Sequence, residues 1–395
     1  METGPLVQKL AKKMLSTLNT PRKAIEPSRV PQAIRETFQN STNLVLRFAD
    51  QAGCSGFWDE VYPTQTRLVL AFVTEALARM GCKLDGMVPR QTIEMSDTHP
   101  KHRNLLAIIY KILEDGGIIE AQGSRFFRTP KHVDTTPSWV IYNQLMRDHP
   151  LQSSEHQLLQ VAGSKLAECL TGAIDPLNLI FGKSRRLLQD FYTNAPMFVS
   201  ASKFACEGIG RAFSGTAECF EILEVGAGLG GTTKYVLDKL VENKTPFRYT
   251  YTDISPSFLA EAKKRYSNLP MGTVEFTPLD IEKTPPERLC GRYHVVLSSN
   301  CIHATKSLAV SSSNIKKLLR SDGFVVLLEF TTRLSWLDLV FGLLEGWWRF
   351  DDGRTHCLAD EKLWRTNLKN AGFKEVLWTG AGGKDKPNPQ TIVAF

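Results

Sequence analysis

A glycine-rich segment, Phe220–Thr233, carries the first residues whose types and spacing could do chemistry. An apolar run leads into three glycines spaced two residues apart, Gly226, Gly228 and Gly230. Glycine lets the backbone turn tightly and approach a ligand, because it has no Cβ. The N–H groups of the helix that follows then face that ligand, with Thr232 or Thr233 expected to cap the helix. This spacing alone indicates only a nucleotide-binding turn.

Three acidic residues make the signal more specific. Glu224 immediately precedes the turn, where a carboxylate can hold the amino group of a methionine moiety. Asp253 ends the next predicted strand, a position from which acids bind ribose hydroxyls. Asp280 follows the third strand and can accept the adenine amino group, with Ile254 and Ile281 packing on the ring. This order predicts S-adenosylmethionine as cofactor and S-adenosylhomocysteine as product, although either aspartate taken singly could be a helix cap.

His303 and Glu329 form a second candidate constellation. Each residue follows a predicted strand, and ligands bind outside the carboxyl ends of strands in open α/β sheets. The two side chains should therefore meet beside the cofactor. Carbon methylation requires a base near neutral pH, which an imidazole can supply, and a carboxylate would orient the ring. The alternative is a histidine satisfied by backbone groups at a helix start, with Glu329 exposed.

Strands and helices alternate along the second half of the chain. The predicted strands span 220–225, 248–252, 273–276, 293–298 and 324–328, and the predicted helices span 231–240, 257–266 and 312–319. Such alternation predicts an α/β fold with a doubly wound, mostly parallel sheet of the class I, Rossmann-like kind.

The first half of the chain is predicted to be mainly helical. Residues 104–113 have a helical pattern, a Gly-Gly pair follows, and 118–120 and 125–128 alternate like two short strands, which together outline a winged helix. A winged helix can bind DNA. No helix here carries the dense Lys/Arg stripe that phosphate binding requires. We therefore favour a structural or dimerising wing and expect no nucleic-acid partner.

We divide the chain at changes in these patterns. The expected parts are a flexible leader 1–28, an N-terminal helical, winged-helix-like domain 29–150, a helical bridge and cofactor cap 151–200, and a catalytic domain 201–395.

Length and composition are those of an ordinary soluble protein. A chain of 395 residues is long enough for two domains, and a net charge of +7 permits an acidic partner without indicating nucleic acid. The eight cysteines include no C-x-x-C pair, so we expect no metal site. We also see no signal peptide and no apolar run of about 20 residues. A cytoplasmic protein with free thiols, not bound to membranes, is expected.

Several short segments carry a family resemblance. They are 56–63 (GFWDEVYP), 179–183 (LIFGK), 192–197 (YTNAPM), 223–228 (LEVGAG), 251–255 (YTDIS), 298–305 (SSNCIHAT) and 328–330 (LEF). Together they are similar to the C-methyltransferase domain of fungal non-reducing polyketide synthases, and the resemblance covers almost the whole chain after residue 30. Glycine motifs of this kind occur in many methyltransferases, whereas the combination of His303 and Glu329 with the N-terminal segments is specific.

The resemblance implies a substrate and a partner. The substrate would be a poly-β-ketoacyl thioester on an acyl carrier protein, methylated at its α-carbon during polyketide biosynthesis, a route to secondary metabolites. His303 would be the general base, and Asn300 would join the cofactor-binding residues. Tyr192 is expected either to cap the cofactor or to pack in the core. The sequence contains no ketosynthase, acyltransferase or carrier domain, so we expect an excised piece of a multifunctional enzyme. Carrier domains are usually acidic, which is compatible with the net positive charge of this chain.

Two other functions stay open at this point. A small-molecule O-methyltransferase acting on phenols would share the cofactor site and even a catalytic histidine. A winged-helix DNA-binding regulator is disfavoured by the intact acids and His303. The segment Gly346–Phe350, with Arg354 and His356, could form a lid over the acyl chain or simply pack on the core.

Overall fold

The computed structural model describes residues 29–395 except 40, 95–97, 215–218, 270–272 and 381–386. The predicted leader 1–28 lies outside the described residues. The chain folds into two compact units. Of the described residues, one unit comprises 29–55, Tyr192–Thr332 and Phe350–Phe395, and the other comprises Gly56–Phe191 and Arg333–Arg349.

The first unit is built on a seven-stranded sheet with the order β5-β4-β3-β6-β7-β9-β8. Its strands are β3 (Phe220–Val225), β4 (Phe247–Asp253), β5 (Val274–Pro278), β6 (Tyr293–Ser299), β7 (Leu319–Glu329), β8 (Val376–Trp378) and β9 (Gln390–Ala394). Neighbouring strands from β5 to β7 are parallel, and β9 runs antiparallel to both β7 and β8. The predicted doubly wound sheet is confirmed, whereas the antiparallel pair at its edge was not expected.

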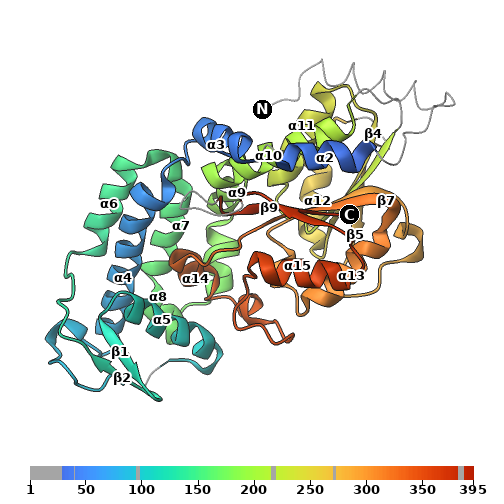
Figure 1. The fold of residues 1–395 in the computed structure, drawn as a ribbon. Helices are drawn as coiled ribbons and strands as arrows, with labels where there is room; N and C mark the ends of the chain where they lie inside the picture. The colour runs from blue at the N-terminus through green and yellow to red at the C-terminus, as the bar shows by residue number, and fades with distance from the viewer. Residues whose placement is uncertain (1–28, 40, 95–97, 215–218, 270–272, 381–386) are drawn as a thin grey trace. The chain divides into compact units, whose positions relative to one another are not determined.

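Helices cover both faces of this sheet (Figure 1). One face is covered by α2 (Arg29–Gln39), α3 (Ser41–Ala52), α10 (Pro196–Ala212), α11 (Gly231–Glu242) and α12 (Pro256–Arg265), and the other by α13 (Leu308–Leu318) and α15 (Glu361–Asn370). Side chains alternate between the two faces along each strand. Ile222 therefore lies in one core and Leu223 in the other, and both are fully buried. Strands buried on both faces are apolar along their length, which explains the predicted strand pattern.

The boundaries between the two units differ from the domain boundaries predicted from the sequence. Helices α2 and α3 belong to the sheet-containing unit because they pack on α10. Their apolar faces, including Ile34 and Phe48, share a core with Phe204 of α10. Helix α14 (Ser335–Phe341) belongs instead to the helical unit, where it packs on α4 (Tyr62–Arg79) and α7 (Ser153–Gly163).

The helical unit contains the predicted winged-helix outline. Its further elements are α5 (Arg103–Asp115), β1 (Ile119–Gln122), β2 (Arg125–Arg128), α6 (Ser138–Asp148) and α8 (Leu166–Leu170). Strands β1 and β2 pair antiparallel around Gly123, and Phe126 of β2 stacks on Tyr110 of α5 at a ring-centroid distance of 4.0 Å. Helix α9 (Arg185–Asn194) crosses from this unit into the other. Along the described chain, none of the helices combines the length and apolar composition that crossing a membrane requires.

Candidate active site

The glycine-rich turn lies between β3 and α11, as predicted. Gly226, Gly228 and Gly230 all have positive φ, at 63°, 56° and 76°. At Gly226 the need for glycine is also steric, because an added Cβ would lie 2.1 Å from the Cys301 sulfur. The turn therefore depends on a residue without a side chain, held against the loop that precedes His303.

Glu224 is buried beneath the turn and is held by two hydroxyl groups. The hydroxyls of Thr233 and Tyr249 donate to its Oε2 at 2.5 and 2.6 Å. Burial raises the pKa of Glu224 to about 7, although the two hydrogen bonds oppose that rise. The prediction that Thr232 or Thr233 caps α11 is wrong. The N-cap is Gly230, without a side-chain hydrogen bond, and the Thr233 hydroxyl is already engaged by Glu224.

Asp253 fastens the turn to the end of β4. Its carboxylate accepts a hydrogen bond from the Gly228 N–H at 2.9 Å and another from the Ser255 N–H at 2.7 Å. Burial raises the pKa of this carboxyl group, while the backbone N–H groups lower it. Asp253 thus lies against the glycine-rich turn, at the strand end predicted for a ribose ligand.

Asp280 lies just beyond β5, in the segment next to Asp253. The Leu279 N–H donates to the backbone oxygen of Asp253 at 3.3 Å, which joins the two strand ends. The Asp280 carboxylate is partly exposed and pairs with Lys283 at 3.1 Å. Ile281 is 4% exposed and packs in the core, whereas Ile254 is 67% exposed.

Asn300 directly follows β6 and has a left-handed conformation, with φ of 48°. Its backbone N–H donates to Leu328 O at 2.8 Å, so it is fixed beside the end of β7. The Oδ1 atom of Asn300 is buried and has no hydrogen-bond partner among the described residues. A buried acceptor without a partner costs free energy, which a bound donor would recover.

His303 and Glu329 meet, as expected from neighbouring parallel strands. The Nδ1 atom of His303 lies 2.5 Å from Glu329 Oε2, and the Ile302 N–H donates to Glu329 Oε1 at 3.0 Å. Both side chains are buried. The alternative of an exposed Glu329 is wrong. A carboxylate on Nδ1 places the proton there and leaves Nε2 of the imidazole as the basic nitrogen.

Tyr192 lies over the start of α11. A Cβ added to Gly231 would lie 2.4 Å from the Tyr192 backbone oxygen, and the Tyr235 hydroxyl donates to Thr193 O at 3.1 Å. Burial raises the pKa of Tyr192 above its ordinary value, and so do the nearby Cys301 and Glu329. Tyr192 is therefore buried next to the turn, and its role as a cofactor cap stays a prediction.

The Trp347 and Trp348 segment packs on its own unit. Trp347 Nε1 donates to Asp338 Oδ1 at 3.2 Å, and Trp348 Nε1 donates to Gly342 O at 2.7 Å. These contacts tie both rings to the region around α14. Arg354 belongs to the other unit, and its guanidinium group contacts backbone oxygens, including that of His303.

Sequence reasoning missed several residues that shape this site. Tyr249 was noted only as part of a strand, and Cys301 only as one of the eight cysteines and as a member of the segment 298–305. The one available signal for Cys301 was its position two residues before His303. Within the described ranges, no three His, Cys, Asp or Glu side chains gather as a metal site would need.

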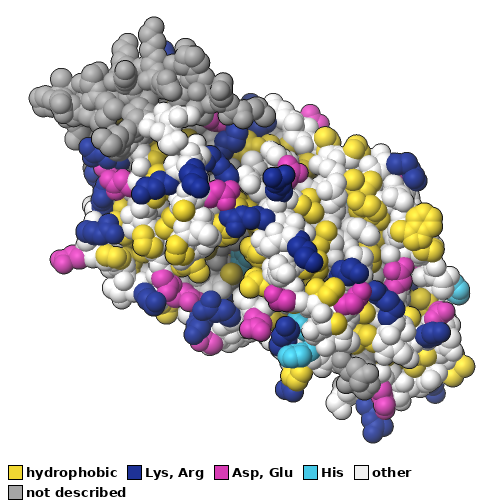
Figure 2. Space-filling model, turned by 180° about the vertical axis from the view of Figure 1, so that it is seen from behind, with side chains coloured by type: hydrophobic (Ala, Val, Ile, Leu, Met, Phe, Trp, Pro, Cys, Tyr) yellow, Lys and Arg dark blue, Asp and Glu magenta, His cyan; other side chains and the backbone are white. Residues whose placement is uncertain are grey.

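Charged side chains show no single basic stripe on the face drawn in Figure 2. Lys and Arg are spread over it and interspersed with Asp and Glu. Phosphate-backbone binding is favoured by concentrated positive charge. This face therefore gives no support to the DNA-binding alternative.

Comparison with known proteins agrees with both halves of the chain. Residues 39–126 match the family described as "Methyltransferase, Helix-turn-helix domain", and residues 223–325 match a methyltransferase domain family. The chain is 48% identical to the polyketide methyltransferase ustM of Ustilaginoidea virens, over 95% of this chain and 87% of that protein. It is 46% identical to 5-methylorsellinic acid synthase of Aspergillus terreus, over 91% of this chain but only 14% of the synthase.

Two solved structures are similar over nearly the whole chain. The CMeT domain of the citrinin polyketide synthase is 35% identical, with a TM-score of 0.89 over 95% of this chain and 99% of that domain. The CurJ carbon methyltransferase is 27% identical, with a TM-score of 0.80 over 94% of this chain and 99% of that chain.

Proposed function

The chain belongs to the polyketide C-methyltransferase family, and we propose that it methylates the α-carbon of a poly-β-ketoacyl thioester carried on an acyl carrier protein. The contact between His303 and Glu329 beside the glycine-rich turn carries this proposal. S-adenosylmethionine supplies the methyl group when it is bound. The carrier protein and the other domains of a synthase are the proposed partners.

The residues around the turn fit that cofactor. The turn carries no side chain at Gly226, Gly228 or Gly230, and Asn300 Oδ1 is a buried acceptor without a partner among the described residues. Glu224 and Asn300 would hold the methionine moiety, Asp253 the ribose and Asp280 the adenine. Ile254 would cover the adenine ring from its exposed position, and Tyr192 would cover the turn.

His303 performs the proton transfer in this proposal. Its Nε2 removes a proton from the carbon between the ketone and the thioester carbonyl, which leaves an enolate. Bound S-adenosylmethionine would supply the methyl group that this carbon takes up, and His303 would keep the proton on its imidazole ring. Glu329 stabilises the resulting imidazolium and keeps the ring in place. A positioned base of this kind contributes about 10²–10⁴ in rate.

The test compares the wild type with His303→Ala on a diketide thioester mimic, with products analysed by mass spectrometry. The wild type is expected to add a methyl group at the α-carbon. The variant should bind S-adenosylmethionine with unchanged affinity and form no product. His132→Ala is the control, because His132 is exposed and lies in the helical unit.

Two results would contradict the proposal. Near wild-type product formation by His303→Ala would remove His303 as the base. Methylation of a phenol by the wild type, without methylation of the thioester, would favour the O-methyltransferase alternative. Docking to the carrier protein is tested separately, since an electrostatic contact must weaken as ionic strength rises.

A further inference from the structure

The segment carrying His303 is held from two sides. It consists of a single 3-10 turn, Ile302–Ala304, and a short link to α13. Glu329 contacts the His303 ring and the Ile302 N–H on one side. On the other side lies a loop of residues 350–358, which is far away in sequence but belongs to the same unit.

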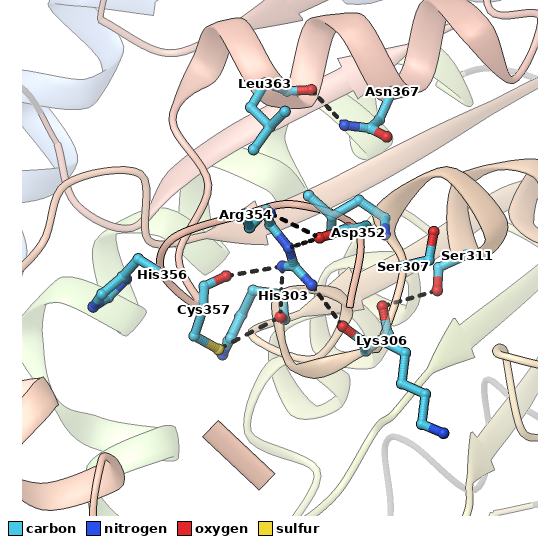
Figure 3. Close-up of polar contacts among 12 residues, drawn as sticks. His303, Lys306, Ser307, Ser311, Asp352, Arg354, His356, Cys357, Leu363 and Asn367 are labelled. Carbon is cyan, nitrogen blue, oxygen red and sulfur yellow. Dashed lines mark hydrogen bonds and ion pairs between the residues drawn. The ribbon is translucent and has the colours of Figure 1, made fainter. Parts of the chain in front are cut away.

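Arg354 is the centre of that second contact (Figure 3). Its guanidinium group donates to His303 O at 3.0 Å, to Thr305 O at 2.7 Å and to Cys357 O at 3.0 Å. Its Nε pairs with Asp352 Oδ1 at 2.7 Å, and the Arg354 side chain is only 2% exposed. A buried arginine is stabilised only when its donors are satisfied, so these bonds hold its position closely.

Asp352 extends the contact along the same segment. Its second carboxylate oxygen, Oδ2, accepts a hydrogen bond from the Leu308 N–H at 2.9 Å, at the start of α13. The neighbouring Asp351 N–H donates to Lys306 O at 3.0 Å. The loop therefore binds the backbone on the C-terminal side of His303, from the base itself to the first residue of α13.

The planar guanidinium group is what allows this arrangement. It presents several donors in a fixed geometry and can bind carbonyl oxygens from two separate segments at once. A lysine offers the same charge on one nitrogen, and it cannot span the carbonyls of His303, Thr305 and Cys357 in the same way. The effect on His303 passes through the backbone, because Arg354 donates to the His303 carbonyl oxygen.

We propose that Arg354, braced by Asp352, is a positioning residue that fixes the backbone of His303 and thereby the direction of its imidazole ring. This inference rests on the proposed role of His303 as the base. A misplacement of about 1 Å at a reacting group can cost about 10²-fold in rate. We therefore expect Arg354→Gln to lower kcat by about 10- to 100-fold, with the affinity for S-adenosylmethionine and the KM for the thioester changed less than twofold.

Three variants and one control test the proposal. Arg354→Lys should restore only part of the lost kcat, and Asp352→Asn should lose less than Arg354→Gln, because asparagine still has an oxygen for the Leu308 N–H. Arg292→Gln is the control. Arg292 stands beside the opposite end of β6, where it pairs with Glu221 at 3.1 Å. It carries the same change of charge and should leave kcat unaltered.

Proton NMR measures the chemical shift of the His303 imidazole N–H, which a general loss of stability would not change. The short contact between His303 and Glu329 predicts a strongly downfield imidazole N–H resonance, which is absent in His303→Ala. We expect this resonance to shift or broaden in Arg354→Gln and Arg354→Lys and to stay in place in Arg292→Gln.

The outcomes separate this inference from the proposed function. If His303→Ala is inactive while folded Arg354→Gln and Arg354→Lys keep kcat within twofold, the positioning role is refuted and the base assignment stands. An equal loss of kcat in Arg292→Gln also refutes the positioning role. If His303→Ala stays active, both proposals fall together. Should Arg354→Gln not fold, the lysine and asparagine variants decide the question by the same criteria.

Discussion

Replacing Glu329 with glutamine tests how much the carboxylate contributes to the base. Glu329 accepts from two donors, the Ile302 N–H at 3.0 Å and the Nδ1 side of His303 at 2.5 Å. Glutamine has a similar shape but only one acceptor oxygen, and its NH₂ group would face the second donor. In Glu329→Gln, either one of the two contacts is lost, or the imidazole takes its other tautomer, with the proton on Nε2, and can no longer act as the base.

The loss of one contact sets the smallest expected effect, because a change of tautomer would remove the base altogether. A hydrogen bond to a charged group is worth about 1.5–3 kcal/mol, which corresponds to about 10- to 150-fold in rate. The loss of negative charge beside the developing imidazolium adds to this figure. We therefore expect kcat to fall by at least about 10-fold, with an unchanged Kd for S-adenosylmethionine.

The assay is steady-state kinetics on the thioester mimic, with calorimetry for cofactor binding and circular dichroism for folding. Glu361→Gln is the matched control. Glu361 accepts from the Thr331 hydroxyl and from Gln390 at 3.1 and 2.7 Å, near the same strand end. A kcat within twofold of wild type in folded Glu329→Gln would refute the reasoning.

Three further predictions follow from buried groups. Gly226→Ala should lower the affinity for S-adenosylmethionine at least about tenfold in calorimetry. The new Cβ would lie 2.1 Å from the Cys301 sulfur, and residue 226 has a φ of 63°. Adding Cys301→Ala should restore part of the lost affinity. The pKa of Glu224 is raised to about 7, and a neutral carboxyl group cannot pair with an ammonium group. Wild-type affinity for S-adenosylmethionine should therefore weaken by up to about tenfold for each pH unit below pH 7. The affinity of Glu224→Gln should show no such pH dependence. Burial raises the pKa of Glu155 to about 8, so the contribution of Glu155 to stability is lost as pH rises. Burial lowers the pKa of His156 to about 4, and this shift affects stability only below pH 6.5, the ordinary pKa of histidine. Chemical denaturation should therefore show a wild-type free energy of unfolding that falls by about 2 kcal/mol between pH 6.5 and 8, and Glu155→Gln should remove most of this fall.

Each of these predictions would be contradicted by a specific result. Unchanged cofactor affinity in Gly226→Ala would show that the turn tolerates a side chain. A pH-independent wild-type affinity would mean that Glu224 serves only to anchor Thr233 and Tyr249. A wild-type stability that is flat between pH 6.5 and 8 would show that Glu155 is ionised in the folded protein.

The sequence alone determined the parallel part of the sheet and most of the candidate site. Apolar periodicity is a local property, so the strands and helices from 220 to 328 could be read from it. Residues at the carboxyl ends of neighbouring parallel strands share one edge of the sheet, which predicted the meeting of His303 and Glu329. Glycine spacing predicted the turn, because only glycine accepts that backbone.

Only the tertiary structure decided which distant segments come together. Asp352 and Arg354 contact the segment around His303, which lies about fifty residues away in the chain. No local sequence pattern predicts a contact between such distant segments. Thr233 has the residue type of a helix cap, yet its hydroxyl binds Glu224, which lies nine residues earlier. Packing partners likewise assigned α2 and α3 to one unit and α14 to the other, because an apolar face shows that a helix is buried but not what covers it.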